Sequence, residues 1–227
     1  EILVNATDRN QLYPTQVTKV KVLVDQASGL ISVENNGPLG GIQVAKHPTE
    51  KNIWNPELTF GNLLTSTNYN DNEKRIVGGR NGYGAKLTNI FSTKFMVTIN
   101  DSVNKLKYSQ KWENNMTVCH PPKMSSYTGN ESSVTISFVP DWERFGGMTG
   151  MNTAVYKILE KRVWDASICT SNQCSVYFQT RKIKTIGTEA YARMYLDDDI
   201  KTWCHNTDRW SVVVAPSESG NFEHVSF

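Results

Sequence analysis

A glycine-rich segment, residues 78–86, constrains the local backbone more than any other part of this sequence. Three of its glycines follow the spacing G-x-x-G-x-G, namely Gly79, Gly82 and Gly84. Glycine lets the backbone adopt positive φ and approach a ligand closely. Residues 85–91 are expected to form the first turns of a helix, whose N-terminus attracts anions, and Arg80 and Lys86 add positive charge. The segment therefore predicts a phosphate-binding loop.

The glycine spacing differs from the two common phosphate-binding motifs. A dinucleotide-binding loop reads G-x-G-x-x-G, and a P-loop has a lysine that is followed by serine or threonine. Here Lys86 lies two residues after Gly84 and is followed by Leu87. A tight turn before a helix, without any ligand, explains the segment equally well when it is taken alone.

The first eight residues, EILVNATD, place three polar side chains on one face if they are helical. Positions 1, 5 and 8 of a helix lie on the same side, so Glu1, Asn5 and Asp8 would point the same way. A carboxylate can orient or deprotonate an attacking water, and an amide oxygen can help to bind Mg²⁺. A solvated polar helix face is the simpler alternative.

Residues 31–37, ISVENNG, read as an alternating strand that runs into an Asn-Asn-Gly turn. An amide such as Asn35 at the end of a strand can hydrogen-bond the edge of a nucleotide base. The alternative is an ordinary turn, because Asn-Gly is a common turn pair.

The composition adds modest constraints. The chain has 227 residues with 38% hydrophobic content, which suffices for one large domain or one and a half. Its net charge of +2 is too small to indicate a nucleic-acid surface. The four cysteines lack zinc-ligand spacing, which favours a reduced, intracellular protein. No apolar run reaches membrane-spanning length, so we expect a soluble protein without a membrane partner.

Hydrophobic periodicity predicts a mixture of helices and strands. A hairpin is expected over residues 20–30, and the polar residues 65–80 are expected to form a lid. Further strands are predicted at 94–99, 105–112, 132–139, 174–179 and 210–216, and helices at 56–64 and 151–166. The pattern indicates an α+β fold with a mixed sheet.

The order Glu-x-x-x-Asn, Asn-Asn-Gly, G-x-x-G-x-G resembles that of the GHKL superfamily of ATPases. The likeness is closest to the ATPase region of eukaryotic-type DNA topoisomerase II. It is carried by EILVNA (1–6), LLTSTNY (63–69), GGRNGYGAKL (78–87) and NIFSTKF (89–95), and it extends over nearly the whole chain.

The resemblance implies a GHKL (Bergerat) α/β sandwich followed by part of a transducer domain of the ribosomal-protein-S5-like type. Residues 1–188 would be the ATP-binding domain, without its N-terminal part, and residues 189–227 would be the start of a truncated transducer. The chain is accordingly expected to be a fragment of a longer polypeptide.

The resemblance also implies a role for each candidate residue. Glu1 would be the general base, Asn5 would coordinate Mg²⁺, and Asp8 would support that site. Asn35 would hydrogen-bond adenine between apolar walls formed by Ile42 and Phe60. Ribose and phosphate would be contacted by Ser66, Thr67 and Asn68. The triphosphate would be wrapped by Gly79, Arg80, Asn81, Gly82, Tyr83, Gly84, Ala85 and Lys86.

The function implied is the ATP-binding and hydrolysing N-gate of a type II DNA topoisomerase, an isomerase that couples dimer closure to passage of one DNA duplex through another. ATP would be the substrate and Mg²⁺ the cofactor, with duplex DNA and a second copy of the chain as partners. The location would be the nucleus, or a viral or cytoplasmic replication site. Alternatives are a nucleotide-dependent clamp that has lost hydrolysis and a gyrase-like or MutL-like ATPase.

Two departures from the family pattern suggest a divergent lineage, viral or protist. The turn after Asn35 is two residues longer than usual, with Pro38 and Leu39 inserted, and Gln43 replaces the usual proline. Arg9 stands where relatives commonly carry asparagine. A cation there could contact phosphate or point to solvent.

Overall fold

The computed structural model describes residues 1–50, 52–63, 82–183, 187–207 and 210–226. Within these ranges the helices are α1 (Ile2–Leu12), α2 (Asn55–Gly61), α3 (Gly84–Ile90), α4 (Thr153–Ile168) and α5 (Gly187–Ala192). Short 3₁₀ turns occur at Gly40–Ile42, Trp142–Arg144 and Arg193–Tyr195. The strands are β1 (Lys19–Asp25), β2 (Leu30–Asn36), β3 (Ser92–Asp101), β4 (Leu106–Glu113), β5 (Val118–Cys119), β6 (Lys123–Ser126), β7 (Ser133–Pro140), β8 (Ser175–Phe178), β9 (Arg181–Ile183), β10 (Trp203–Asn206) and β11 (Ser211–Val214).

Nine of the described strands form one mixed sheet in the order β5-β4-β3-β7-β2-β1-β8-β9, with β6 also paired to β4. The pairing of β1 with β8 is parallel, whereas β1–β2, β2–β7, β7–β3 and β3–β4 are antiparallel. The mixed α+β sheet predicted from the sequence is confirmed. The short strands β5, β6 and β9 at its edges were not predicted.

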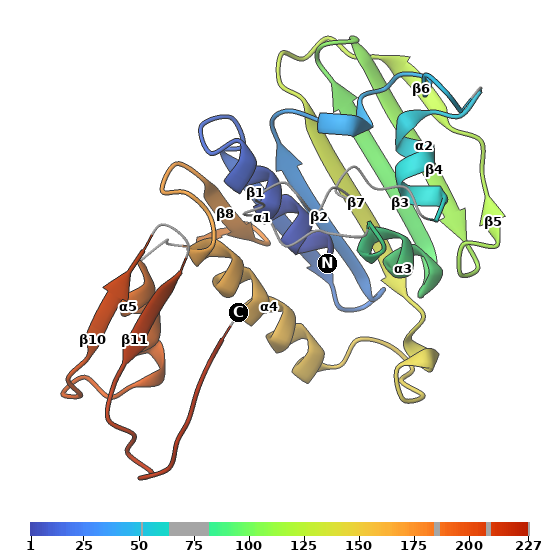
Figure 1. Ribbon diagram of the computed structural model, residues 1–227. Coiled ribbons are helices and arrows are strands. Elements are labelled where there is room, and N and C mark those ends of the chain that lie inside the picture. Colours follow the sequence, from blue (N-terminus) through green and yellow to red (C-terminus); the bar gives the residue numbers. More distant parts are fainter. Residues whose placement is uncertain (51, 64–81, 184–186, 208–209, 227) are drawn as a thin grey trace.

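One face of this sheet carries the hydrophobic core. Alternate residues of β3, namely Phe95, Val97 and Ile99, are fully buried. In Figure 1, α1, α3 and α4 lie on the same side of the sheet, and they contact β2, β3 and β8, respectively. The opposite face is polar, with Ser32 bonded to Ser137 at 2.9 Å between their hydroxyl oxygens. A sheet covered on one side explains why its strands alternate between apolar and polar residues.

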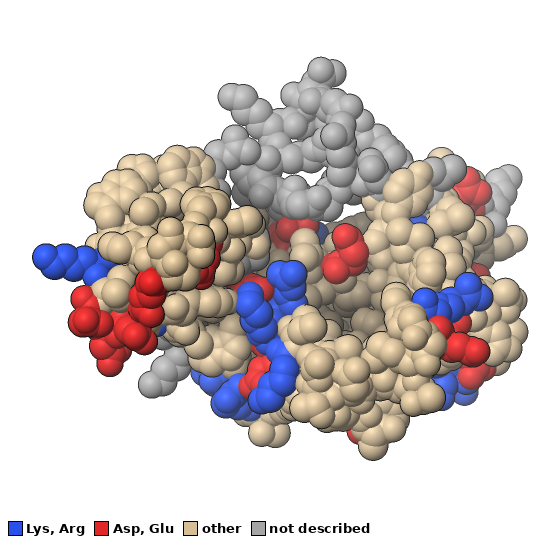
Figure 2. Space-filling model, turned by 90° about the horizontal axis from the view of Figure 1, so that it is seen from below, with Lys and Arg blue, Asp and Glu red and all other residues tan. Residues whose placement is uncertain are grey.

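Helix α4 begins at Thr153, two residues after its predicted start. Asn152 caps its N-terminus by accepting a hydrogen bond from the backbone N–H of Val155 at 2.9 Å. Its outer surface carries charges of both signs, including a Lys157–Glu160 ion pair at 3.2 Å. Figure 2 shows lysine and arginine side chains near the middle of the face in view, with acidic side chains among them. Mixed charge of this kind agrees with the small net charge.

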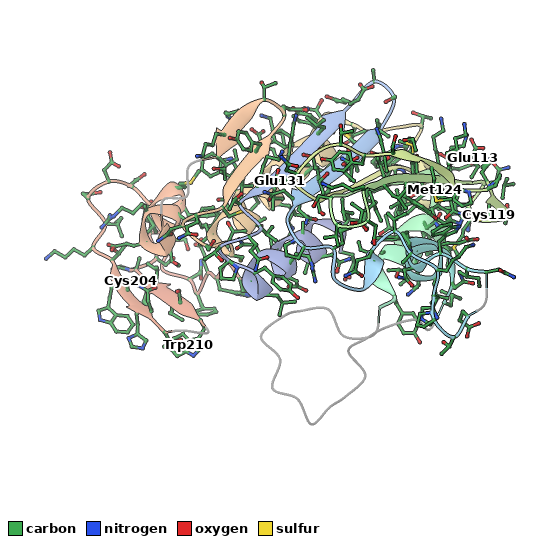
Figure 3. All side chains as sticks on the ribbon, turned by 90° about the horizontal axis from the view of Figure 1, so that it is seen from above. Glu113, Cys119, Met124, Glu131, Cys204 and Trp210 are labelled. Atoms are coloured by element: carbon green, nitrogen blue, oxygen red, sulfur yellow. The ribbon has the colours of Figure 1, made fainter. Side chains whose placement is uncertain are left out.

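After β9 the chain leaves the large sheet and forms α5 and the two-stranded sheet β10–β11. Figure 3 shows Cys204 and Trp210 of this part at the opposite end of the molecule from Glu113 and Cys119. The predicted domain boundary at residue 188 falls inside α5, and it stays a prediction. Among the described residues, no helix combines the length and apolar character that crossing a membrane requires.

Candidate functional site

Helix α1 positions the three polar residues predicted at the start of the chain. Its inner side is buried through Ile2 and Ala6, which are 6% and 3% exposed. Glu1 is the N-cap residue and is exposed, whereas Asn5 and Asp8 are half-buried. The backbone N–H of Asn5 donates to the carbonyl oxygen of Glu1 at 2.9 Å, which is the first hydrogen bond of α1. The predicted helix is therefore present, with these polar residues outside its buried side.

The side chain of Glu1 lies against Gly84, the first residue of α3. A Cβ atom added to Gly84 would stand 2.6 Å from Cδ and 2.8 Å from Cγ of Glu1. Figure 1 shows the N-terminus of the chain next to α3. A side chain at position 84 would displace the carboxylate from this place, so the predicted base and the predicted phosphate loop lie together.

The described part of the glycine-rich loop begins at Gly82, which has a φ of +67°. Lys86 is 1% exposed, and its ammonium group donates to the carbonyl oxygen of Gly82 at 2.8 Å. Burial lowers the pKa of Lys86. The lysine thus supports the loop from inside, whereas Tyr83 is 39% exposed and Ala85 is buried.

Six predicted contacts lie outside the described residues, and they remain predictions. They are Ser66, Thr67, Asn68, Gly79, Arg80 and Asn81.

The two adjacent asparagines at the end of β2 differ in what they contact. Asn36 is 2% exposed, and its side-chain oxygen accepts from the backbone N–H groups of Thr18 and Lys19 at 2.9 and 2.8 Å. Its amide nitrogen donates to the hydroxyl of Thr18 and to Glu131 at 2.9 and 2.6 Å. Asn36 is therefore fully engaged within the protein. Asn35 is half-buried, and its amide nitrogen donates to the backbone carbonyl oxygen of Asn36 at 3.1 Å.

Arg9 contacts the inserted turn after β2, which neither of the alternatives drawn from the sequence anticipated. Its Nη2 donates to the carbonyl oxygen of Pro38 at 2.5 Å, and its Cζ lies 4.7 Å from the centre of the Tyr13 ring. Burial lowers the pKa of Arg9, which the neighbouring Tyr13 partly offsets. Arg9 and the inserted Pro38, which both depart from the family pattern, are therefore in contact.

The two predicted walls of the base pocket have different environments. Ile42 is half-buried at the end of the 3₁₀ turn Gly40–Ile42 and packs against the core. Phe60 is 4% exposed, and its ring centre lies 6.3 Å from that of Phe95. Phe60 thus belongs to the core of the sheet, and Ile42 lies nearer the surface.

Asp101 anchors the far end of the inserted turn and was not identified from the sequence. Its carboxylate is fully buried and accepts from the backbone N–H of Val44 at 2.8 Å. It also accepts from the backbone of Val103 and Asn104 at 3.0 and 2.9 Å. Burial opposes ionisation, but these hydrogen bonds outweigh it and hold the pKa of Asp101 below its usual value. The local Asp-x-x-Asn turn could have been found in the sequence, but the bond to Val44 could not.

Among the described residues, no group of three or more His, Cys, Asp or Glu side chains is arranged to hold a metal ion. Mg²⁺ commonly takes only one or two protein ligands, together with water and substrate phosphates. The amide of Asn5, between Glu1 and Asp8, fits that pattern of binding. A separate cavity of about 240 Å³ is lined by residues of α4, α5 and the turn Arg193–Tyr195, and by none of the predicted site residues.

The chain is similar over its whole length to DNA topoisomerase 2 of Candida glabrata and to a probable DNA topoisomerase 2 of Dictyostelium discoideum. The identities are 39% over 246 residues and 41% over 231 residues, and the alignments cover 17% and 15% of those proteins. The chain thus spans about one sixth of the length of the relatives it matches. No family model matches the chain.

Solved structures show the same fold. The crystal structure of the ATPase region of Saccharomyces cerevisiae topoisomerase II is 39% identical, with a TM-score of 0.87, and the match covers 96% of this chain and 56% of that one. The ATPase and transducer domains of DNA topoisomerase II from Balamuthia mandrillaris are 37% identical, with a TM-score of 0.87 and coverages of 97% and 55%. The predicted fold class is confirmed by these matches.

Proposed function

Because this chain belongs to the family of eukaryotic DNA topoisomerase II and aligns with its ATPase region, we propose that it is the ATP-binding and hydrolysing N-gate of a type II DNA topoisomerase. One observation carries the proposal. The Glu1 carboxylate lies against Gly84, where the glycine-rich loop enters α3, so a base and a phosphate-binding segment meet.

Each residue of the site then has a role in ATP hydrolysis. Glu1 would orient the water that attacks the γ-phosphate and take up its proton. Asn5 would supply an amide oxygen to Mg²⁺, and the ion would offset the negative charge that develops on the phosphate. Asp8, on the same helix, would support this arrangement.

The adenine ring and the triphosphate would be bound by different segments of the chain. Asn35 would hydrogen-bond the amino edge of adenine, with Ile42 and Phe60 as apolar neighbours. Backbone groups of residues 79–86 would wrap the triphosphate, while Ser66, Thr67 and Asn68 would contact the ribose and phosphate. The described part of that wrapping segment is residues 82–86, which include the exposed Tyr83 and the buried Lys86.

The role of the whole protein follows from the family. ATP binding would close two copies of this region into a dimeric gate that holds one DNA duplex, and hydrolysis would reset the gate after that duplex has passed through another. We accordingly place the protein on nuclear DNA, or at a viral or cytoplasmic replication site. The names of the relatives support a change of DNA topology as the activity of the whole protein.

The test compares Glu1→Gln with the unchanged full-length protein. We expect ATP turnover to fall by about a hundredfold or more, as is typical when a general base is lost. Binding of a non-hydrolysable ATP analogue with Mg²⁺ should persist. Glu34→Gln is a matched control, because Glu34 pairs with Lys19 on the polar face of the sheet at 3.1 Å. Equal turnover by Glu1→Gln and unchanged protein would overturn the hydrolytic role and favour a clamp that only dimerises.

A further inference from the structure

The side chain of Arg9 connects the turn that follows Asn35 to α1. Its Nη2 donates to the carbonyl oxygen of Pro38 at 2.5 Å. The guanidinium group also packs against Gly40, where an added Cβ would stand 2.7 Å from Nη1, 3.0 Å from Nη2 and 3.1 Å from Cζ. The φ of Gly40 is +62°, a conformation that side chains other than glycine rarely adopt. The contact therefore combines a hydrogen bond with a close backbone approach.

Of the two adjacent glycines in the turn, Gly40 lies against Arg9 and Gly41 does not. An added Cβ at Gly41 would have no atom within 4 Å, and the φ of Gly41 is not positive. Between Pro38 and Gly40, the side chain of Leu39 is 7% exposed and belongs to the core. Leu39 thus fixes the inner side of the turn by packing in the core, and Arg9 fixes its outer side by a hydrogen bond.

The partners of Arg9 are neutral groups, the carbonyl oxygen of Pro38 and the ring of Tyr13. A half-buried guanidinium group that bonds a carbonyl and stacks on an aromatic ring fixes geometry through its planar shape. Arg9 is also on the same helix as Glu1 and Asn5. It therefore connects the helix that carries the proposed base to the turn that follows Asn35.

The other end of the turn is held independently. Asp101 of β3 accepts from the backbone N–H of Val44 at 2.8 Å. Ile42, the predicted apolar neighbour of adenine, lies between this anchor and the one at Pro38. The position of Ile42 is thus set from both sides, by α1 and by β3.

We propose that Arg9 is a positioning residue for the base pocket, which holds the turn Pro38–Gly41 on α1 so that Asn35 and Ile42 can receive adenine. This proposal rests on the proposed function, because it takes the site to bind ATP. Arg9 would act on the base and leave the binding of the triphosphate unchanged. The inserted turn and the arginine would then form one unit, each needed to place the other.

The test separates base recognition from phosphate recognition in the full-length protein. The dissociation constants of ATP and of inorganic tripolyphosphate, both with Mg²⁺, are measured by competition against a fluorescent ATP analogue. For Arg9→Gln we expect the affinity for ATP to fall about tenfold, the scale of a hydrogen bond to a charged group, with little change for tripolyphosphate. The KM for ATP should rise while kcat changes little, and the preference for ATP over GTP should narrow.

Three further variants support the measurement. Gly40→Ala should reproduce the effect of Arg9→Gln, because its Cβ would displace the guanidinium group, and Gly41→Ala should behave as the unchanged protein. Arg9→Lys keeps the charge without the planar group, and it should recover only part of the affinity for ATP. If Arg9→Gln does not fold, as judged by thermal unfolding, Arg9→Lys supplies the comparison.

The outcomes are distinct. An equal loss of affinity for ATP and tripolyphosphate would overturn the proposal and make Arg9 a phosphate contact. Unchanged constants for both ligands in Arg9→Gln would show that the turn does not depend on Arg9. Failure of the unchanged protein to bind either ligand would overturn the proposed function.

Discussion

The carboxylate of Glu1 and the backbone of Gly84 are in direct contact, although 83 positions separate them in the sequence. Glu1 directly precedes α1 and Gly84 begins α3, so the contact joins the starts of two helices. Residues of different helices can hold such a fixed relation because both helices pack on the same face of the sheet. In the proposed function this relation places the general base beside the phosphate-binding segment.

The first prediction tests this relation through Gly84→Ala. The added methyl group would occupy the space of the Glu1 side chain and displace its carboxylate. We expect ATP turnover by the full-length protein to fall about a hundredfold, as for loss of a positioned base, with a smaller effect on nucleotide binding. Steady-state kinetics together with analogue binding would measure both.

Gly150→Ala is the control for that substitution, because an added Cβ at Gly150 would meet no atom within 4 Å. Its turnover should equal that of the unchanged protein. Normal turnover by Gly84→Ala would mean that the contact with Glu1 has no part in the reaction.

The second prediction concerns Lys86, whose buried ammonium group donates to the carbonyl oxygen of Gly82. Lys86→Met keeps most of the apolar stem but removes the donor, which leaves a carbonyl of the loop without this bond. We expect the free energy of unfolding in urea to fall by about 1–3 kcal/mol. Nucleotide affinity and turnover should fall as well, because the loop loses its internal support.

The exposed Lys94 provides a matched substitution on β3. Lys94→Met should leave stability and nucleotide binding nearly unchanged. A similar result for Lys86→Met would show that the buried lysine is dispensable to the loop.

The third prediction is a pH dependence caused by Asp101. Its pKa in the folded protein is below the usual value, so the unfolded chain binds a proton more readily in acid. The stabilisation is therefore present above the unfolded pKa of about 4 and is lost as the pH falls through the folded pKa. Urea unfolding of Asp101→Asn should show a loss of about 1–3 kcal/mol near neutral pH, which shrinks below about pH 4.

Asp25 is a suitable comparison because its carboxylate accepts hydrogen bonds within an exposed turn, from Ser28 at 2.6 Å and Ala27 at 3.1 Å. Asp25→Asn should cost less stability than Asp101→Asn at neutral pH. A difference between Asp101→Asn and the unchanged protein that stays constant from neutral pH down to about pH 3 would contradict the assignment.

The fourth prediction concerns the joint between α4 and α5. The hydroxyl of Tyr191 donates to the carboxylate of Asp165, which is 4% exposed and also pairs with Lys161 at 3.0 Å and Arg162 at 3.1 Å. Burial and the neighbouring carboxylate raise the pKa of Tyr191, so its hydroxyl stays protonated. Tyr191→Phe should lower the free energy of unfolding by about 1–3 kcal/mol, because the buried carboxylate of Asp165 loses one of its donors.

Tyr195→Phe should have a smaller effect on unfolding in urea, since Tyr195 is 46% exposed and its hydroxyl pairs with that of Tyr191 rather than with the carboxylate of Asp165. Equal losses for both variants would argue against the bond between Tyr191 and Asp165 as the main link at this joint.

The elements that depend on local periodicity were predictable from the sequence. The hairpin β1–β2 was expected from alternating valines, and its inward residues Val20, Val22 and Val24 are buried. The helix after the glycine-rich loop was expected at 85–91 and is Gly84–Ile90. The short strands β5 and β9 were missed, because a strand of two or three residues forms only when a neighbour supplies its hydrogen bonds.

The sequence by itself determined the polar face of α1, the alternation of the central strands and the position of the glycine-rich loop, because each of these depends on residues a few positions apart. Only the tertiary structure decided that the side chain of Asn36 is buried and bonded within the protein while that of Asn35 is half-buried, and that Arg9 holds Pro38. It alone joined Glu1 to Gly84. These relations connect residues from different elements, and the packing of helices on one face of the sheet is what brings them into contact.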